Sequence, residues 1–457
     1  MMPNPPVTLE QWLAYIERLH HRSIDLGLER VRAVAGRLGL GASLGMPSIV
    51  VGGTNGKGST CAMLEAIYRA AGYRVGRYGS PHLVRFSERA AIDGRPVEDE
   101  ELAERFAAVE RARGATTLTY FEFSTLAVFS LFAQRGLDLA VLEVGLGGRL
   151  DAVNLIDADC AIVTTVDLDH TELLGSTREQ IGLEKAHIFR GGRPAVCVDP
   201  EPPAALLEYA RTIGAALRRI GPDFAVEAGS PGLRQWTYRS DRPQGTRRSL
   251  PWPALRGSHQ LRNAAGALAA IEALDQRLPV DQQAVRAGLT GVRLAGRFQV
   301  VPGRPALILD VAHNPHAARA LAQALHEHGA IAAPGEAAPG AVPALAPAEA
   351  PRARGGARTF AVFGMLRDKD AAAVVQALAA SIDVWHLAGT VGERSLSAER
   401  LRDGALASLA APCTAHDSVA QALDAAMAEA SADDRIVVFG SFVIVAEALR
   451  WLERGSQ

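Results

Sequence analysis

The sequence predicts an α/β protein, with a P-loop-type, mainly parallel sheet domain followed by a smaller Rossmann-like α/β domain. The β-branched residues 49–51 run into a glycine-rich turn and then into a helix-forming stretch, 61–71. Strand-like and helix-like segments then alternate along most of the chain, which is typical of parallel sheets. Because 457 residues exceed the usual size of one core, we expect two domains, at 1–294 and 295–457.

The glycine-rich turn after residue 51 has the composition of a phosphate-binding loop. Glycines let backbone N–H groups approach phosphate oxygens, the following helix presents its positive end, and Lys57 adds a full charge. The common nucleotide signature places Ser or Thr directly after the lysine, whereas Gly58 intervenes here. The alternative is an ordinary strand-to-helix turn. The residues that this loop would present to phosphate are Thr54, Asn55, Gly56, Lys57, Gly58 and Ser59.

The predicted first domain begins with a helix capped by Thr8 and Gln11, and a second helix ends near residue 39. Polar residues and the lack of a helical period predict short hairpins at 224–250. The remaining strands are predicted at 74–78, 137–144, 160–166 and 193–198, and the remaining helices at 98–111, 120–135, 204–217, 260–274 and 281–288.

The predicted second domain alternates strands and helices from residue 297 onward. Residues 331–357 within it are rich in Ala, Pro and Gly and lack an apolar period, so we expect a flexible surface insertion there. The strands are predicted at 298–301, 306–310, 359–364, 384–388 and 435–440, and the helices at 317–328, 371–380 and 441–453.

Composition and charge argue against some classes of function. With a formal net charge of −2, nothing in the composition predicts a nucleic-acid or anionic-membrane partner. No apolar run is long enough to cross a bilayer. Cys61, Cys160, Cys197 and Cys413 show no paired spacing, so we expect reduced cysteines and a cytoplasmic location.

Polar residues gather where predicted strands end. Glu143 ends one strand of the first domain, His170 follows the next, and Asp310 follows one in the second domain. Because ligands of open α/β sheets bind at the carboxyl ends of strands, Glu143 and His170 are candidate metal ligands. The alternatives are a solvated strand end and a structural histidine. On residue type alone, the helical pair Glu184-Lys185 is expected to face solvent.

Six separated motifs together resemble one family. They are Gly53-Thr54-Asn55-Gly56-Lys57-Gly58-Ser59, Ser80-Pro81-His82-Leu83, residues 143–151 (EVGLGGRLD), Leu168-Asp169-His170-Thr171, Gly296-Arg297-Phe298-Gln299 and residues 310–315 (DVAHNP). Their order, along nearly the whole chain, resembles that of the folylpolyglutamate synthases within the Mur ligase superfamily. Residues 24–31, 119–122 and 150–152 resemble more specifically the bifunctional bacterial members, which are also dihydrofolate synthases.

This resemblance implies an ATP-dependent ligase that joins L-glutamate to dihydropteroate and to reduced folates. A carboxylate of the pterin substrate takes the γ-phosphate of ATP, and the glutamate amine then displaces phosphate and forms an amide. Asn263, Arg297 and Asp310 would bind ATP together with the phosphate loop. Lys57, Lys185 and His313 would act in catalysis, and the family implies a monomer.

The resemblance also implies two Mg²⁺ sites, with Ser80, Glu143 and His170 as ligands. In the family, the lysine that matches Lys185 is carbamylated by CO₂, which turns a cation into an anionic ligand or orienter. His187 stands here where the family usually has Gly, and it places bulk near that lysine. The alternative is a plain ammonium on phosphate.

The bifunctional members imply a dihydropteroate site. Its residues here would be Gly27, Leu28, Glu29, Thr119, Tyr120, Phe121, Glu122, Leu150, Asp151 and Ala152. The alternative for these residues is core packing and a turn, which would leave a monofunctional folylpolyglutamate synthase. A peptidoglycan-type ligase is expected to carry an added N-terminal domain, for which too little chain precedes the loop. A P-loop GTPase is expected to show a guanine-reading Asn-Lys-x-Asp segment, and the sequence has none.

Overall fold

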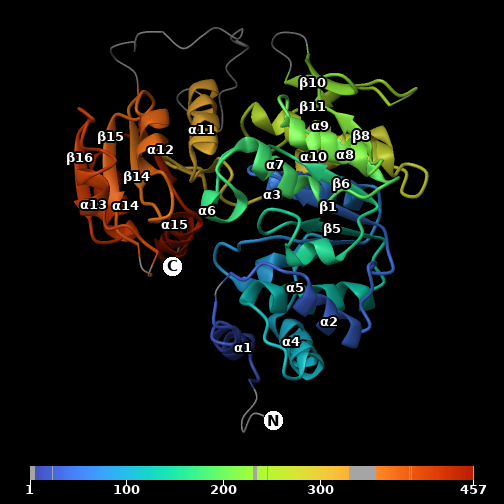
Figure 1. Ribbon diagram of the computed structural model, residues 1–457. Helices are drawn as coiled ribbons and strands as arrows, with labels where there is room; N and C mark the ends of the chain where they lie inside the picture. The colour runs from blue at the N-terminus through green and yellow to red at the C-terminus, as the bar shows by residue number, and fades with distance from the viewer. Residues whose placement is uncertain are drawn as a thin grey trace. The chain divides into compact units, whose positions relative to one another are not determined.

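The computed structural model describes residues 6–22, 24–229, 234–243, 245–328, 357–390, 392 and 394–455. They group into two compact units, the first drawn from 1–227, 236–254 and 261–292, the second from 228–235, 255–260 and 293–457. Each unit has its own mainly parallel sheet with helices packed on it, so the predicted α/β class is confirmed (Figure 1). The predicted insertion at 331–357 lies, apart from its last residue, outside the described residues.

The sheet of the first unit has eight strands in the order β4-β3-β2-β5-β1-β6-β7-β8. The strands from β2 to β8 in this order are parallel, and β3 and β4 extend the β2 edge antiparallel. Central strand β1 is buried along its whole length, which explains its β-branched, apolar sequence. The bounds are β1 Ser48–Gly52, β2 Val75–Tyr78, β3 Ala90–Ile92, β4 Arg95–Pro96, β5 Leu139–Glu143, β6 Cys160–Val163, β7 Pro194–Cys197 and β8 Ala216–Arg219.

Helices cover both faces of this sheet. In Figure 1, α2, α4 and α5 lie below the sheet and α9 and α10 above it. The apolar helix α5 contributes Phe123, Phe129 and Phe132 to the core on its side. The bounds are α1 Leu9–Ile16, α2 Glu29–Arg37, α3 Lys57–Ala70, α4 Asp99–Arg113, α5 Tyr120–Gln134, α6 Thr171–Leu174, α7 Arg178–Ala186, α8 Ala204–Thr212, α9 His259–Ala273 and α10 Gln282–Gly291, with 3-10 turns η1 Phe86–Arg89 and η2 Ala152–Leu155.

The predicted helix at 204–217 is wrong in its last part. Helix α8 ends at Thr212, and residues 216–219 instead form the edge strand β8, paired with β7. Gly214 has a φ of 67°, a left-handed conformation that ends helices and that glycine adopts readily. The predicted hairpins form a three-stranded sheet, β11-β10-β9, from β9 Phe224–Ala228, β10 Gln235–Ser240 and β11 Arg247–Pro251.

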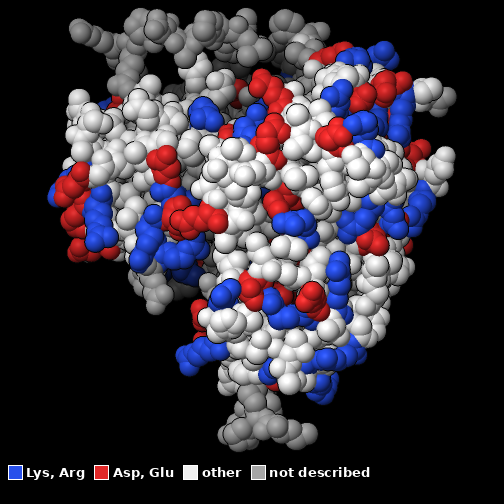
Figure 2. Space-filling view, viewed as in Figure 1, with Lys and Arg blue, Asp and Glu red and all other residues white. Residues whose placement is uncertain are grey.

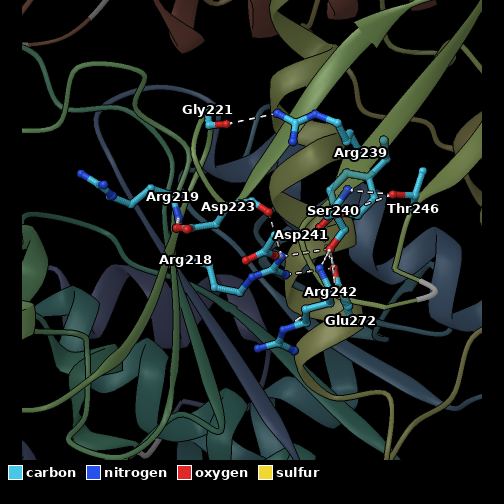
Figure 3. A network of polar contacts seen from close by, with 11 residues as sticks. Arg218, Arg219, Gly221, Asp223, Arg239, Ser240, Asp241, Arg242, Thr246 and Glu272 are labelled. Carbon is cyan, nitrogen blue, oxygen red and sulfur yellow. Dashed lines mark hydrogen bonds and ion pairs between the residues drawn. The ribbon is translucent and has the colours of Figure 1, made fainter.

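A buried network of charges joins β8, β10 and α9 at this edge (Figure 3). The Arg218 guanidinium donates to Glu272 Oε2 at 2.9 Å and to Ser240 Oγ at 3.0 Å. It also pairs with Asp241, while Tyr238 donates to Glu272 Oε2 at 2.8 Å. The Arg218 side chain is only 7% exposed. Each charge in this network therefore meets an opposite charge or a hydrogen-bonding group.

The second unit has a six-stranded sheet in the order β12-β13-β17-β14-β15-β16, parallel except for β12. Three elements of this unit, β16, α13 and α14, were not among those predicted from the sequence. The strand β16 is half-exposed, and its residues Cys413–His416 contain no apolar run. The bounds are β12 Gln299–Val301, β13 Ala306–Leu309, β14 Thr359–Phe363, β15 Val384–Ala388, β16 Cys413–His416, β17 Arg435–Phe439, α11 Pro315–Glu327, α12 Ala371–Leu378, α13 Ala398–Asp403, α14 Val419–Glu429 and α15 Phe442–Gly455.

Surface charge is mixed on the face shown in Figure 2, where basic and acidic side chains are interspersed. An anionic ligand that approaches this face would therefore be attracted by individual basic side chains and not by a broad positive potential. Among the described residues, none of the helices combines the length and apolarity that crossing a membrane requires.

Candidate active site

The loop between β1 and α3 needs glycine at two positions. Gly53 has a φ of 141°, and a Cβ there would lie 1.9 Å from Thr164 Oγ1. Gly56, the N-cap of α3, has a φ of 91°, and a Cβ there would lie 2.6 Å from Asn263 Oδ1. The Lys57 ammonium donates to two carbonyls of the loop, at 3.0 and 3.1 Å. The result is a tight loop with an ammonium over it and the amide of Asn263, from α9, beside it.

Hydrogen bonds fix this loop to the segment after β6. The Thr54 N–H donates to the Thr165 carbonyl at 2.7 Å, and the Asn55 N–H donates to Thr165 Oγ1 at 3.0 Å. The Thr54 hydroxyl donates to the Asp167 carbonyl at 3.1 Å and accepts the Asp167 N–H at 3.0 Å. The predicted phosphate loop and the segment that leads to His170 therefore form one rigid edge.

Lys185 lies within electrostatic reach of Lys57. Thr177 caps α7, as predicted, and the helix buries the Lys185 side chain, which is 3% exposed. Burial, and next the charge of Lys57, lower the pKa of Lys185 to about 7, against the weaker opposing influence of nearby carboxylates. The expectation from residue type that this lysine faces solvent is therefore wrong. Its neighbour Glu184 does pair outward, with Arg149 at 2.7 Å.

His187 does not crowd this lysine. Its ring packs against Tyr209 of α8, with centroids 4.2 Å apart, and its Nδ1 donates to the Leu183 carbonyl at 2.7 Å. The added bulk that the sequence places beside Lys185 is thus taken up between α7 and α8.

The turn after β5 packs directly on α7. A Cβ on Gly148 would lie 2.6 Å from the Glu184 carbonyl oxygen and 3.1 Å from the Lys185 Cα. Asp151 holds the turn, because its carboxylate accepts the N–H groups of Leu146 at 2.7 Å and Val153 at 2.9 Å. Burial raises the pKa of Asp151 to about 6. Both carboxylate oxygens are therefore occupied by backbone groups of the turn itself.

The three predicted metal ligands follow adjacent parallel strands. Ser80 follows β2, Glu143 ends β5 and His170 follows β6, and these strands, with β1 between the last two, are contiguous in the sheet. The Glu143 carboxylate faces the Ser80 segment, because a Cβ on Gly79 would lie 2.9 Å from Glu143 Oε2. His170 is 35% exposed on its side chain.

A hydroxyl and a carboxylate fit a Mg²⁺ ion that takes its other ligands from phosphate and water, whereas an imidazole is a less usual Mg²⁺ ligand and would belong to a second site. Within the described ranges, the structure contains no group of three or more His, Cys, Asp or Glu residues that could hold a metal unaided.

The three predicted pteroate segments meet around the N-terminus of α5. Thr119 caps that helix, and Glu122 accepts the Thr119 N–H at 2.8 Å and an Arg30 N–H at 3.1 Å. Arg30 belongs to α2, directly after the segment that contains Gly27. The Phe121 ring lies under the turn after β5, since a Cβ on Gly145 would lie 2.5 Å from it. Helices α2 and α5 both contact η2, which begins at Ala152.

Sequence reasoning missed a cationic cluster beside Tyr120. The Arg89 guanidinium lies 5.4 Å from the centre of the Tyr120 ring and 5.3 Å from that of Phe86, and its Nε donates to His82 Nδ1 at 2.9 Å. His82 belongs to the loop that contains Ser80, a predicted metal ligand. The basic and aromatic residues Arg85, Phe86 and Arg89, which lie close together after His82, are the signal that could have found it.

Arg297, Asp310 and His313 come together in the second unit. Asp310 accepts the N–H groups of Phe298 and Ala312, both at 2.8 Å, and burial raises its pKa. The Phe442 ring lies 5.1 Å from the Arg297 guanidinium and 6.2 Å from the His313 ring. His313 Nδ1 donates to the Val311 carbonyl at 2.8 Å, which fixes the orientation of the ring.

Comparison with known proteins identifies the family of this chain. The Mur ligase middle domain family matches residues 51–202, and the Mur ligase glutamate ligase domain family matches residues 335–442. A relative from Escherichia coli (strain K12), named dihydrofolate synthase/folylpolyglutamate synthase, is 43% identical over 455 residues, which cover 99% of this chain and 97% of the relative.

Two solved structures share the whole architecture. The structure named E.coli FolC in complex with DHPP and ADP has a TM-score of 0.87 and 42% identity, and the match covers 99% of this chain and 100% of that one. A bifunctional folylpolyglutamate synthase/dihydrofolate synthase with Mn, AMPPNP and L-glutamate bound has a TM-score of 0.85 and 40% identity, with the same coverage. The chain therefore belongs to the bifunctional dihydrofolate synthase/folylpolyglutamate synthase family, ATP-dependent ligases of the Mur ligase superfamily.

Proposed function

We propose that this chain adds L-glutamate to dihydropteroate, forming dihydrofolate, and to the glutamate tail of reduced folates, with ATP as the energy source. The observation that carries the proposal is the glycine-rich loop between β1 and α3, with the Lys57 ammonium over it and the N-terminus of α3 behind it. A loop at a helix N-terminus and beside an ammonium favours an anionic ligand. A triphosphate and a substrate carboxylate supply that charge.

The reaction needs positioning and charge neutralisation but no covalent bond to the protein. A carboxylate oxygen of the pterin substrate attacks the γ-phosphorus of ATP and ADP leaves; the glutamate amine then attacks the acyl carbon, and phosphate leaves with the new amide formed. The loop N–H groups, the N-terminus of α3 and Lys57 hold phosphates, and Asn263 lies where it can contact the nucleotide. In the second unit, Arg297 and Asp310 are proposed for ATP, and His313 for the γ-phosphate or glutamate.

Ser80, Glu143 and His170 are proposed to hold Mg²⁺ at two sites. The ion would neutralise phosphate charge and raise the reactivity of the γ-phosphorus. The manganese, AMPPNP and glutamate in one related structure, and the ADP and DHPP in another, support this set of ligands and substrates. Segments 27–29, 119–122 and 150–152 are proposed for the dihydropteroate, with Asp151 and Glu122 acting through the turns that they hold.

Lys185 is proposed to react with CO₂. Its lowered pKa, about 7, gives a neutral amine near physiological pH, and only the neutral amine can attack the carbon of CO₂ and release a proton. The carbamate would place an anionic oxygen group beside Lys57 and convert the like-charge pair into an opposite-charge pair. Carbon-13 NMR with labelled bicarbonate tests this step, because a carbamate signal should appear in the parent and be absent from Lys185→Met.

Phosphate release from Mg-ATP, with L-glutamate present, tests the function as a whole. Turnover with both dihydropteroate and tetrahydrofolate would establish the bifunctional activity. Turnover with tetrahydrofolate alone would leave a monofunctional folylpolyglutamate synthase. If neither substrate gave phosphate release, and a Lys57→Ala variant bound ATP as tightly as the parent, the ligase assignment would be contradicted.

A further inference from the structure

The segment between α1 and α2 has little regular secondary structure. Residues 24–27 form neither helix nor strand, and Ile24 is 47% exposed despite its size. Gly27, in the same segment, adds conformational freedom rather than restraint. Side chains must therefore hold this segment against the rest of the first unit.

Arg30 makes several of the contacts that hold this segment in place. The Arg30 guanidinium contacts Asp25 Oδ2 at 2.6 Å and donates to the Asp25 carbonyl at 2.7 Å, so it grips both the side chain and the backbone of the segment. The same group donates to Glu122 Oε1 at 3.1 Å, although 92 residues separate the two. Arg30 thus clamps the irregular segment to the N-terminus of α5.

A second bridge runs parallel to the first. His20, whose side chain is 4% exposed, contacts Asp25 Oδ2 at 3.1 Å through Nε2 and Thr117 Oγ1 at 3.0 Å through Nδ1. Thr117 lies two residues before the cap of α5, which is Thr119. The two bridges therefore fix the segment to the stretch that enters α5 and to the first turn of that helix.

The clamp holds position more than it adds stability. The Glu122 side chain is 5% exposed and that of Arg30 27%, so the charges are largely withdrawn from water. Arg30 Nε is buried and makes no hydrogen bond to the part of the chain that the structure describes, which is an uncompensated desolvation. An apolar contact would stabilise the segment without that penalty.

We propose that Arg30 is a positioning residue for the dihydropteroate reaction, which it supports by clamping residues 24–28 against the N-terminus of α5. The inference rests on the proposed function, in which Gly27–Glu29 and Thr119–Glu122 line the dihydropteroate site. Both segments carry the clamp's anchors, so loosening the clamp separates the two walls of that site. The phosphate loop and the metal ligands have no member in the clamp, and the segments that it joins are those proposed for dihydropteroate alone, so we expect the tetrahydrofolate reaction not to depend on it.

The test compares Arg30→Met with Arg37→Met in the full-length protein. Arg37 lies seven residues, about two turns, further along the same helix, and it holds the far end of α2 through bonds to the Ala112 carbonyl at 3.2 Å, the Arg113 carbonyl at 2.8 Å and Thr116 Oγ1 at 3.3 Å. Steady-state kinetics with dihydropteroate and with tetrahydrofolate give KM and kcat for each variant.

We expect Arg30→Met to raise the KM for dihydropteroate about 10–100-fold, because two charge-assisted contacts are lost, with kcat and the tetrahydrofolate KM close to the parent values. Arg30→Lys should recover part of the loss. An equal loss with both substrates, an unchanged dihydropteroate KM, or the same KM shift in Arg37→Met would overturn the inference.

If Arg30→Met does not fold, His20→Gln tests the outer bridge with a smaller perturbation. It should raise only the dihydropteroate KM, and parallel changes with both substrates would again contradict the clamp. A parent that is inactive with dihydropteroate but active with tetrahydrofolate would overturn the proposed bifunctional activity, and the clamp with it. A parent active with both substrates leaves the variants to decide on the clamp alone.

Discussion

The first unit contains two clusters of buried charge that differ in one respect. At the β8 edge, the Arg218 guanidinium meets Glu272, Asp241 and Ser240, so its charge is matched within the protein (Figure 3). At the β1 loop, the Lys57 ammonium donates to two carbonyl oxygens of its own loop, and its charge, after burial, helps to lower the pKa of Lys185. The first cluster pairs its arginine directly with carboxylates, whereas in the second the nearby carboxylates only partly oppose burial and the charge of Lys57.

This difference separates structural charge from functional charge in a fold where both are buried. A network in which each charge meets an opposite charge should contribute to stability and have no effect on the catalytic rate. A pair of like charges should lower the stability of the free protein and matter for the catalytic rate, since their repulsion would be relieved when phosphate binds. Variants in each cluster should therefore move stability and activity in opposite senses.

The largest effect is expected for Arg218→Met. Removing Arg218 leaves the buried Glu272 with the more distant Arg242 guanidinium, at 3.9 Å, and we expect the free energy of unfolding to fall by about 3 kcal/mol. Urea denaturation of the purified protein measures it, and kcat/KM below the unfolding transition should stay close to that of the parent. The control is Arg211→Met, which removes an exposed ion pair with Glu208 and should shift the urea midpoint little. Equal shifts in the two variants would mean that the buried network is not what stabilises this edge.

Lys57→Met should show the opposite pattern. Loss of the cation that faces the phosphates should lower kcat/KM about 10²–10³-fold with either pterin substrate, because the transition state carries charge that the loop amides alone do not neutralise. Phosphate-release kinetics give the rate, and the urea midpoint should not fall. A large loss of stability with modest loss of activity would place Lys57 among the structural charges.

Lys185→Met should stabilise the protein while inactivating it. In the folded protein the pKa of Lys185 is about 7, below the usual lysine value of 10.5. Between these two pH values the unfolded chain holds a proton that the folded lysine has released, so the stability of the parent rises with pH. Below pH 7 both states are protonated, and the parent carries the full cost of burying the charge.

In CO₂-free buffer at pH 7, we expect the methionine variant to be more stable than the parent by about 2 kcal/mol. Its stability should also lack the rise between pH 7 and pH 10.5. Urea midpoints across that range measure both effects. A variant less stable than the parent at every pH would show that the lysine is matched by carboxylates, as Arg218 is.

The phosphate loop could be predicted because its requirements are local. Gly53 and Gly56 mark positive φ values, and Lys57 and Ser59 open a helix, so four neighbouring residues encode the site. The burial of Lys185 could not, since it depends on the turn after β5 packing on α7, a contact between segments far apart in the chain.

Two other features show the same limit. The Arg30–Glu122 contact spans 92 residues and leaves no mark in either local sequence. Strand β8 has the Ala-Leu-Arg-Arg composition of a helix, and pairing with β7 after Gly214 overrode that local preference. Sequence patterns thus predicted which residues could bind phosphate, but the fold decided which charges remained unmatched.

The smallest effect is expected for His187→Gly, which restores the residue that the family usually has beside the lysine. Because the His187 ring packs on Tyr209 and not on Lys185, kcat/KM should remain within about twofold of the parent, and stability should fall by about 1 kcal/mol through the lost ring contact and the flexible glycine. Tyr209→Leu is the matched control and should lose similar stability from the other side of the contact. A tenfold or greater rise in kcat/KM for His187→Gly would show instead that the histidine restricts Lys185.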